Sequence, residues 1–449
     1  MAKSTHAEPA VTQDEISGDS TRSAGFNPFS VLRFGDYKFV WSSEALSLWA
    51  IEMEIIVLAM FVLSDTGSPL LVGLIGALKF AGTLLGPLYG LMVDRFDRKK
   101  LQVWVRAFGA ALAIALTILV FTDTLELWHA YVIVTAGSMV RMLDLVLVQA
   151  LTADAVPAHS LHGAIGLSRS TLDGARVVGS IAGGTIFATL GLDWAYLAIT
   201  VLYLLATLAS LKVTSRVVAN TVHSESIRTG LREGFRYVRQ SEMLPGLIFF
   251  SFLIEFTAFP IVNGLMTVIG DELFDLGGTG IGLLAAAASI GALMGALAIG
   301  LRPNVSNPAR IVIIGSLIWH VLMLTLALVP TLWLFALILV LWGFSGGATF
   351  VAMVVGLLRA APAKTRGRVM GIRSLGIYGL PLGLLLGGWI SEDIGSAAMI
   401  GTLGAIGLVA TVFAAVKWPA LLHQSTRSSP TADSPATSSS ANDSATNSK

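Results

Sequence analysis

The stretch GLMVDRFDRKK, residues 90–100, decides the fold because it is a short, highly charged segment between two long apolar ones. The apolar runs at about 70–93 and 101–122 are each long enough to cross the roughly 30 Å of hydrocarbon in a bilayer. Lys and Arg concentrate in the short cytoplasmic loops of membrane proteins. We therefore expect residues 90–100 to connect two membrane-spanning helices on the cytoplasmic side.

The composition of the whole chain agrees with a membrane protein. Of its 449 residues, 54% are hydrophobic and 13% are charged, whereas about a quarter of the residues in a soluble domain are charged. The absence of cysteine excludes disulfides, thiolate metal sites and thiol catalysis. A net charge of +1 gives no electrostatic footprint for nucleic acid. The polar first 25 residues lack the apolar segment of a signal peptide, so we expect the N-terminus to stay in the cytoplasm.

Further apolar runs of spanning length follow along the chain. They fall at about 39–64, 128–150, 167–190, 194–213, 244–269, 279–301, 309–329, 332–357, 369–390 and 397–417. Together with the first two runs, they predict an all-α membrane protein with twelve transmembrane helices.

The connections between these runs alternate in charge. One set is basic and contains Arg95, Arg98, Lys99, Lys100, the arginines from Arg216 to Arg239, Arg302, Arg310, Arg359, Lys364, Arg366 and Arg368. The other set has no Lys or Arg and contains Asp65, Asp123, Glu126, Asp193, Asp271, Glu272, Asp275, Glu392 and Asp393. The positive-inside rule then predicts that the basic set and both chain termini are cytoplasmic.

The two halves of the chain repeat each other. A shift of 209 residues places Gly73, Gly82 and Gly86 on Gly282, Gly291 and Gly295. A shift of 204 residues places Arg169, Ser170, Gly179, Gly183, Gly184 and Gly191 on Arg373, Ser374, Gly383, Gly387, Gly388 and Gly395. Six spans separate the matching segments, so the repeats have parallel topology around an axis along the membrane normal. Two six-helix halves of this kind imply a solute path between them.

The predicted spans and the composition divide the chain into five segments. These are a cytoplasmic N-terminal tail at 1–30, a six-helix half at 31–213, a cytoplasmic linker at 214–243, a second six-helix half at 244–418 and a disordered cytoplasmic tail at 419–449. In the linker, Arg228, Arg232 and Arg236 follow an i, i+4 spacing, which predicts a basic amphipathic helix near anionic headgroups. The tail is rich in Ser, Thr and Ala and has no apolar period.

The charged segment between the second and third spans resembles the cytoplasmic loop motif of the major facilitator superfamily, G-x-x-x-D-R-x-G-R-K. The resemblance implies a cytoplasmic gate motif formed by Gly90, Asp94, Arg95, Arg98 and Lys99. It also implies the superfamily's fold and transport by alternating access, in a monomer of the bacterial cytoplasmic membrane.

Further stretches are similar to the drug:proton antiporter branch of that superfamily, which contains macrolide-efflux and siderophore-exporter types. Asp97 replaces the second glycine of the loop motif, a departure that resembles this branch. The stretches Thr66–Pro69, Glu233–Arg239 and Arg366–Met370 also look like it. The similarity covers roughly residues 30–417.

Two other motifs of the superfamily are present in altered form. The glycine-rich antiporter motif of the fifth span has Ala175 at its first small position and Ser180 in place of proline. The span-4 motif retains only Arg141. The glycines of the span-5 motif and their span-11 counterparts are Gly179, Gly183, Gly184, Gly383, Gly387 and Gly388. Because the span-5 match is partial, uptake by symport stays open beside export by antiport.

Charged residues near the middle of the predicted spans are the candidates for proton coupling or for the substrate cavity. They are Glu52, Glu54, Lys79, Arg141, Asp144 and Glu255. Each costs about 2.5–3.5 kcal/mol near a helix centre, so each needs a partner, a water cavity or a function. Glu52 and Glu54 are about 200° apart around a helix, so they cannot both face the central cavity, and one of them is expected to face the second span and Lys79 instead.

Each of these charges has a structural and a functional interpretation. Lys79 and a glutamate could form a buried pair that specifies packing, or the glutamate could take up and release a proton. Arg141 and Asp144, at i, i+3, could neutralise each other or support proton movement. Lone Glu255 is expected to face a cavity, whereas lone His320 is expected to be structural.

The sequence thus predicts a secondary active transporter that exports a small amphipathic molecule in exchange for protons. The alternatives are a proton-coupled uptake symporter and, more remotely, a non-transporting membrane sensor. The chain has no Walker A motif, no H-E-x-x-H or G-x-S-x-G motif and no clustered metal ligands. We therefore expect neither enzymatic activity nor a cofactor, and the expected partners are the lipid bilayer, the substrate and protons.

Overall fold

The computed structural model describes residues 28–85, 89, 92–93, 95–157, 160–213, 235–302, 306–361 and 366–422. Nearly all of these residues are helical, as expected where lipid offers no partner to backbone N–H and C=O groups. Most of the predicted N-terminal tail, most of the linker, most of the predicted C-terminal tail, Gly90 and Asp94 lie outside the described residues.

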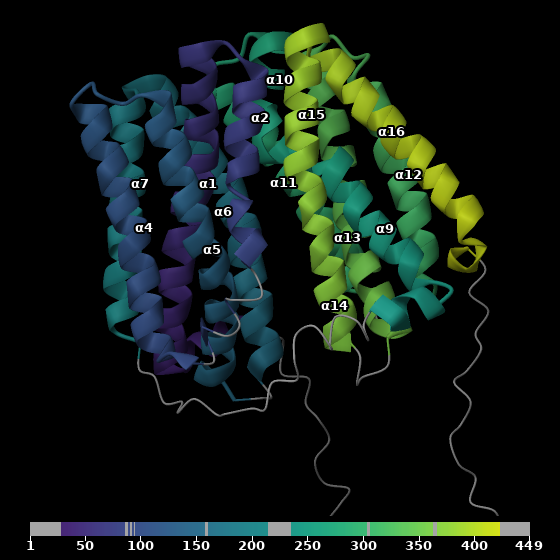
Figure 1. Ribbon diagram of the computed structural model, residues 1–449, viewed down its shortest axis with the longest axis horizontal. Helices are drawn as coiled ribbons and strands as arrows, with labels where there is room; N and C mark the ends of the chain where they lie inside the picture. Colours follow the sequence, from purple (N-terminus) through teal and green to yellow (C-terminus); the bar gives the residue numbers. More distant parts are fainter. Residues whose placement is uncertain are drawn as a thin grey trace, which may run out of the picture.

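The helices form two bundles that lie side by side (Figure 1). The first bundle consists of α1 (Gly35–Thr66), α2 (Pro69–Leu78), the 3-10 turn η3 (Ala81–Leu85), α4 (Arg98–Phe121), α5 (Leu127–Ala155), α6 (Leu161–Leu190) and α7 (Leu192–Leu211). The second consists of α9 (Leu244–Thr257), the π-helical η5 (Ile261–Leu265), α10 (Met266–Phe274), α11 (Gly278–Gly300), α12 (Pro308–Leu326), α13 (Leu332–Ala360), α14 (Arg366–Ser374), η6 (Leu375–Tyr378), α15 (Gly379–Ile394) and α16 (Ser396–Lys417). Short 3-10 turns, η2 (Pro28–Arg33) and η7 (Pro419–Leu421), stand at the two ends.

Ten helices within the described ranges are long and apolar enough to cross a membrane. The predicted spans at 70–93 and 167–190 are not among them, for two different reasons. The α-helix of the first ends at Leu78, and only a short apolar helix, Pro69–Thr83, is recognised there. Helix α6 is long enough, but it carries Arg169, Asp173 and Arg176 among small and polar residues.

One backbone feature repeats between the two bundles. Gly191, between α6 and α7, has φ of 91°, and Gly395, between α15 and α16, has φ of 92°. Only glycine adopts such a left-handed backbone readily. These two glycines are related by the 204-residue shift, so the repeat in the sequence corresponds to a repeated turn in the structure.

The two bundles contact each other toward one end of the molecule. Helix α2 packs on α15, and α6 packs on α11. A Cβ atom on Gly184 of α6 would overlap the carbonyl oxygen of Gly278 of α11, so the two backbones touch. Glu392 of α15 accepts hydrogen bonds from the Ser68 hydroxyl and, at 3.1 Å, from the backbone N–H of Leu70 at the start of α2.

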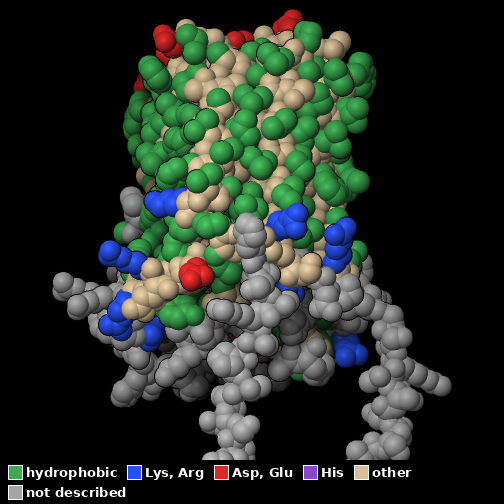
Figure 2. All heavy atoms as spheres, turned by 90° about the vertical axis from the view of Figure 1, so that its right-hand side faces the viewer, with side chains coloured by type: hydrophobic (Ala, Val, Ile, Leu, Met, Phe, Trp, Pro, Cys, Tyr) green, Lys and Arg blue, Asp and Glu red, His purple; other side chains and the backbone are tan. Residues whose placement is uncertain are grey.

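The contact end carries acidic side chains, and the other end carries basic ones. Figure 2 shows Asp and Glu at the upper end, Lys and Arg toward the lower end, and a hydrophobic belt between them. In Figure 1 the ribbons of the two bundles lie together near α2, α10 and α15 and lie apart near α5 and α14. The two halves therefore converge at the acidic end and diverge at the basic end.

Candidate functional site

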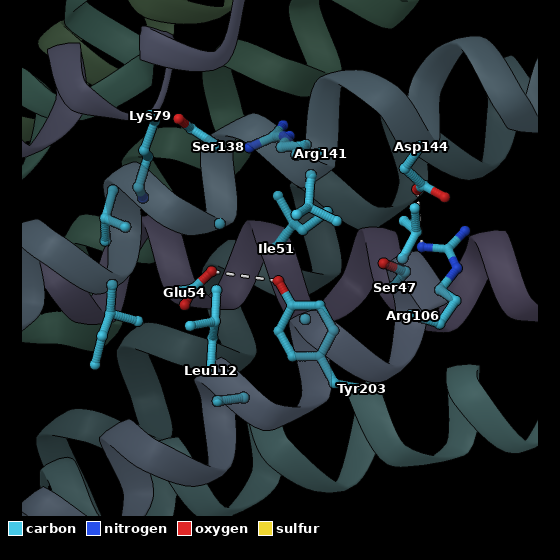
Figure 3. Close-up of a pocket in the computed structure, with 17 residues that line it drawn as sticks. Ser47, Ile51, Glu54, Lys79, Arg106, Leu112, Ser138, Arg141, Asp144 and Tyr203 are labelled. Atoms are coloured by element: carbon cyan, nitrogen blue, oxygen red, sulfur yellow. Dashed lines mark hydrogen bonds and ion pairs between the residues drawn. The ribbon is translucent and has the colours of Figure 1, made fainter. Parts of the chain in front are cut away.

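A pocket that contains several charged side chains lies inside the first bundle, and α1, α4, α5, α7 and the residue after α2 line it (Figure 3). It encloses about 730 Å³ of empty space, including the part open to solvent. Four of the predicted candidates line it, namely Glu54, Lys79, Arg141 and Asp144. The structure adds polar neighbours that the sequence analysis did not place there, namely Ser47, Arg106, Ser138 and Tyr203.

Glu54 of α1 is one of the two carboxylates that line this pocket. The hydroxyl of Tyr203, from α7, donates a hydrogen bond of 3.3 Å to its Oε2. Lys79 and Arg141 interact with Glu54 electrostatically. Lys79 is the residue that directly follows α2, and its side chain lines the same pocket. A single buried carboxylate thus faces two cations from different segments.

Asp144 pairs with Arg106 of α4, although the sequence suggested Arg141 as its partner. Arg106 Nη1 lies 2.9 Å from Asp144 Oδ2, and Arg106 Nε donates a 3.1 Å hydrogen bond to Ser43. The Arg106 side chain is only 3% exposed, and it was not among the candidates from the sequence. Helices α4 and α5 run antiparallel, so residue 106 meets residue 144 across them.

Removing Arg106 is expected to destabilise the fold. In Arg106→Gln, the Asp144 carboxylate stays buried without its ion pair, which costs about 3–5 kcal/mol. The double variant Arg106→Gln/Asp144→Asn has no unpaired carboxylate at this position. Most of the lost stability should therefore return. Thermal unfolding in detergent measures both effects.

The matched control for this prediction is Arg98→Gln. Arg98 pairs with Asp154 at 2.6 Å, and the two side chains are 23% and 25% exposed, so its loss should cost only about 0–1 kcal/mol. A double variant no more stable than Arg106→Gln would contradict this account of the buried pair.

Glu52 and Glu255, the other two candidates, do not line the pocket. Glu52 Oε1 lies 3.7 Å from Arg176 Nε of α6, and Arg176 also approaches Asp173 at 3.8 Å. Arg176 interacts electrostatically with Glu255, which belongs to α9 in the other half. This second polar group is therefore shared between the two halves.

Further polar residues extend this group. Arg169 pairs with Asp173 at 3.2 Å and is 53% exposed, and it interacts electrostatically with Arg373 of the second half. The guanidinium of Arg373 also lies 4.9 Å from the ring centroid of Phe350. Charged residues of both signs from the two halves thus interact with one another, including a repulsion between Arg169 and Arg373.

The described part of the loop motif performs local structural roles. Asp97, which departs from the superfamily pattern, caps α4 by accepting a 2.9 Å hydrogen bond from the Lys100 N–H. Arg98 reaches Asp154 at the end of α5. Arg95 is exposed and Lys99 is half-buried.

The glycine motifs have matching environments in the two halves. Cβ atoms on Gly179 and Gly183 would approach Glu52 and Met53 of α1. Their counterparts Gly383 and Gly387 face residues of the same bundle, Phe256 and Leu265 respectively. The last glycine of each motif instead contacts the opposite half: Gly184 touches Gly278, and Gly388 touches Pro69 and Leu70.

His320 lies in a buried hydroxyl cluster of the second half. Its Nε2 is 2.9 Å from Thr257 Oγ1, its Nδ1 is 2.7 Å from the Ser316 carbonyl oxygen, and Ser316 Oγ is 2.9 Å from Thr411 Oγ1. These contacts join α9, α12 and α16. Among the described residues, no group of three or more His, Cys, Asp or Glu side chains could hold a metal ion.

Comparisons with known proteins agree on the class of molecule. A family profile described as transmembrane secretion effector, labelled MFS_3, matches residues 25–444. Macrolide efflux protein A of Streptococcus pyogenes is 27% identical over 374 residues, which cover 79% of this chain and 89% of that protein. The enterobactin exporter EntS of Shigella flexneri is 25% identical over 346 residues, which cover 75% of this chain and 76% of that protein.

Solved structures show the same fold. A bacterial homologue of the lysosomal transporter Spinster, in an inward-facing and unoccupied conformation, has a TM-score of 0.66 at 12% identity, covering 86% of this chain and 95% of that one. The POT family transporter PepTSo has a TM-score of 0.68 at 12% identity, and the match covers 87% of this chain and 99% of that one.

Proposed function

The chain belongs to the transmembrane secretion effectors of the major facilitator superfamily, and on this basis we propose that it exports a small amphipathic molecule in exchange for protons. Its substrate class would be a drug, a siderophore or another secondary metabolite. The pocket in which Glu54 faces Lys79 and Arg141 supports the proton-coupling part of this proposal. The bacterial efflux relatives and the apolar helices support a multi-pass location in a bacterial cytoplasmic membrane.

The proposed topology has twelve spans and cytoplasmic termini. Helix α6 completes the fifth span despite its charges, which face the space between the halves rather than lipid. Helix α2 and η3 form the first part of the second span. The positive-inside rule assigns the basic end to the cytoplasm. The halves, which converge at the acidic end, would then be in an inward-facing state of a monomer.

In this state, the substrate path would run between the halves. Glu52 and Arg176 on one side and Glu255 and Arg373 on the other supply charged partners for polar groups of the substrate. The proton site is proposed to be separate from this path, because Glu54 lies in the pocket of the first bundle. Protonation of Glu54 would remove its attraction for Lys79 and Arg141, and the two segments that carry these cations could then shift.

The alternatives differ in direction and in kind. Uptake by symport is not favoured, because the named relatives are efflux and exporter proteins. A non-transporting sensor gives no role to an intramembrane pocket lined by five charged side chains, which are costly to bury without a function. Neither alternative has an observation of its own in support.

Transport in everted membrane vesicles tests the proposal. Vesicles with an acidic lumen and a pH-sensitive dye are given a macrolide, erythromycin, or a catecholate siderophore. Antiport predicts that addition of a substrate releases lumenal protons and that the compound accumulates inside. Release of protons by no member of a broad compound panel would contradict antiport, and proton uptake together with the compound would indicate symport.

A further inference from the structure

Glu44 is a carboxylate of α1 that neither the sequence motifs nor the pocket includes, and it is half-buried. The Ser168 hydroxyl of α6 donates a 2.8 Å hydrogen bond to its Oε2. Arg106 of α4 and Asp144 of α5 interact with it electrostatically, and so does Tyr37 of its own helix. Glu44 therefore lies where α1, α4, α5 and α6 meet.

Glu44 is connected to the pocket through the Arg106–Asp144 pair. Arg106 donates a hydrogen bond to Ser43, the residue next to Glu44, and forms its ion pair with Asp144. Both Arg106 and Asp144 line the pocket that contains Glu54. Along α1, Glu44 lies ten residues, about 15 Å, nearer to the basic end than Glu54. Three carboxylates thus extend from mid-membrane toward the end where the halves diverge.

Two atoms of the connecting pair have unused hydrogen-bonding capacity. Arg106 Nη2 and Asp144 Oδ1 are buried, and neither has a hydrogen-bond partner among the residues that the structure describes. An unsatisfied buried polar group costs about 1–3 kcal/mol, and a buried water molecule with polar partners normally removes that cost. The adjoining pocket, whose empty space of about 730 Å³ includes the part open to solvent, has room for water. Hydrogen-bonded water can therefore link the three carboxylates.

We propose that Glu44 is the proton-releasing carboxylate on the cytoplasmic side, so that protons leave through the first bundle and not along the substrate path. This rests on the proposed function. The O–H bond of protonated Glu54 breaks, and its proton passes through water and Asp144 to the Glu44 carboxylate, where a new O–H bond forms. Glu44 then gives the proton to bulk water. Glu54 and Asp144 are again carboxylates, and Arg106 keeps its charge throughout.

The test compares Glu44→Gln, which cannot carry a proton, with Glu44→Asp, which can. Proton release from acidic everted vesicles is followed after addition of erythromycin, across a range of external pH. We expect Glu44→Gln to slow release by about a hundredfold, the lower end of what a positioned proton-transfer group contributes. Glu44→Asp should restore most of the rate. Erythromycin binding to the purified protein should change less than about twofold, because Glu44 lies outside the proposed substrate path.

Ser168→Ala is the matched control, because it removes the hydrogen bond to Glu44 but no titratable group. Proton release by Glu44→Gln at the wild-type rate would overturn the inference. An equal loss of proton release in Glu44→Gln, Glu44→Asp and Ser168→Ala, together with a loss of erythromycin binding, would also overturn the inference. That pattern would indicate that Glu44 has a packing role.

A measurement without substrate separates this inference from the proposed function. Infrared difference spectra of the purified protein during a pH titration report the protonated carboxyl groups. The wild type should show a carboxyl band that is absent in Glu44→Gln, and identical spectra would overturn the inference. Absence of proton release from wild-type vesicles with every compound of the panel would count against the proposed exporter, whereas the infrared result would still decide whether Glu44 takes up a proton.

Discussion

Replacing Glu54 with glutamine is expected to abolish proton-driven export while leaving the protein folded. The amide cannot take up a proton, but its oxygen can still accept the 3.3 Å hydrogen bond from Tyr203. The variant should therefore lose substrate accumulation driven by a pH gradient. It should still exchange labelled for unlabelled erythromycin across the membrane, because exchange requires the conformational cycle but no net proton movement. Vesicle accumulation and counterflow measure the two activities separately.

Glu52→Gln is the matched control, since Glu52 lies on the same helix but faces Arg176 outside the pocket. Tyr203→Phe removes only the hydrogen bond to Glu54 and should leave coupling largely intact. If Glu52→Gln lost coupling and Glu54→Gln kept it, the coupling carboxylate would lie between the halves, and the pocket would be structural.

Replacing Gly184 with valine is expected to stop transport by a different route. The new side chain would overlap the backbone of α11 at Gly278, so the halves could not close at the acidic end as they do here. Overpacking of this kind costs about 1–3 kcal/mol, which shifts a two-state population by about 5- to 150-fold. The equilibrium should move toward states that are open at the acidic end.

The natural absence of cysteine makes this shift measurable by spin labelling. Labels at Asp65→Cys and Asp393→Cys, which are exposed at the acidic ends of the two halves, report their separation. The distance should increase in Gly184→Val. Gly174→Val is the matched control on the same helix, because a Cβ there meets nothing within 4 Å. An unchanged distance in Gly184→Val, or an equal effect of both variants, would contradict the contact argument.

The sequence located the helices well because the requirement for a spanning helix is local. About twenty consecutive apolar residues suffice, whatever the rest of the chain does. The two exceptions are instructive. Helix α2 ends at Leu78 within a stretch that is otherwise apolar on both sides, and only the folded bundle shows that Lys79 lines the pocket. Helix α6 was found from its apolar content, but its charges make sense only beside Glu52 and Glu255.

The candidate charges were identifiable one by one because a charged side chain inside an apolar run is visible in the sequence. Their partners were not. Helical geometry separates Glu52 from Glu54 by about 200°, and the structure assigns Glu54 to the pocket with Lys79 and Glu52 to Arg176. Nothing in the sequence distinguished Arg141 from Arg106 as the partner of Asp144.

By itself, the sequence determined the helical membrane class, the internal repeat, the family and a short list of buried charges, because each follows from residue type and spacing along one chain. Only the tertiary structure decided which charges share a pocket, that Arg106 holds Asp144, and that the last glycine of each motif lets the two halves touch. Such pairings join residues tens of positions apart, and they depend on the depth and rotation of each helix in the bundle. Those quantities are set by packing between helices, which no single segment encodes.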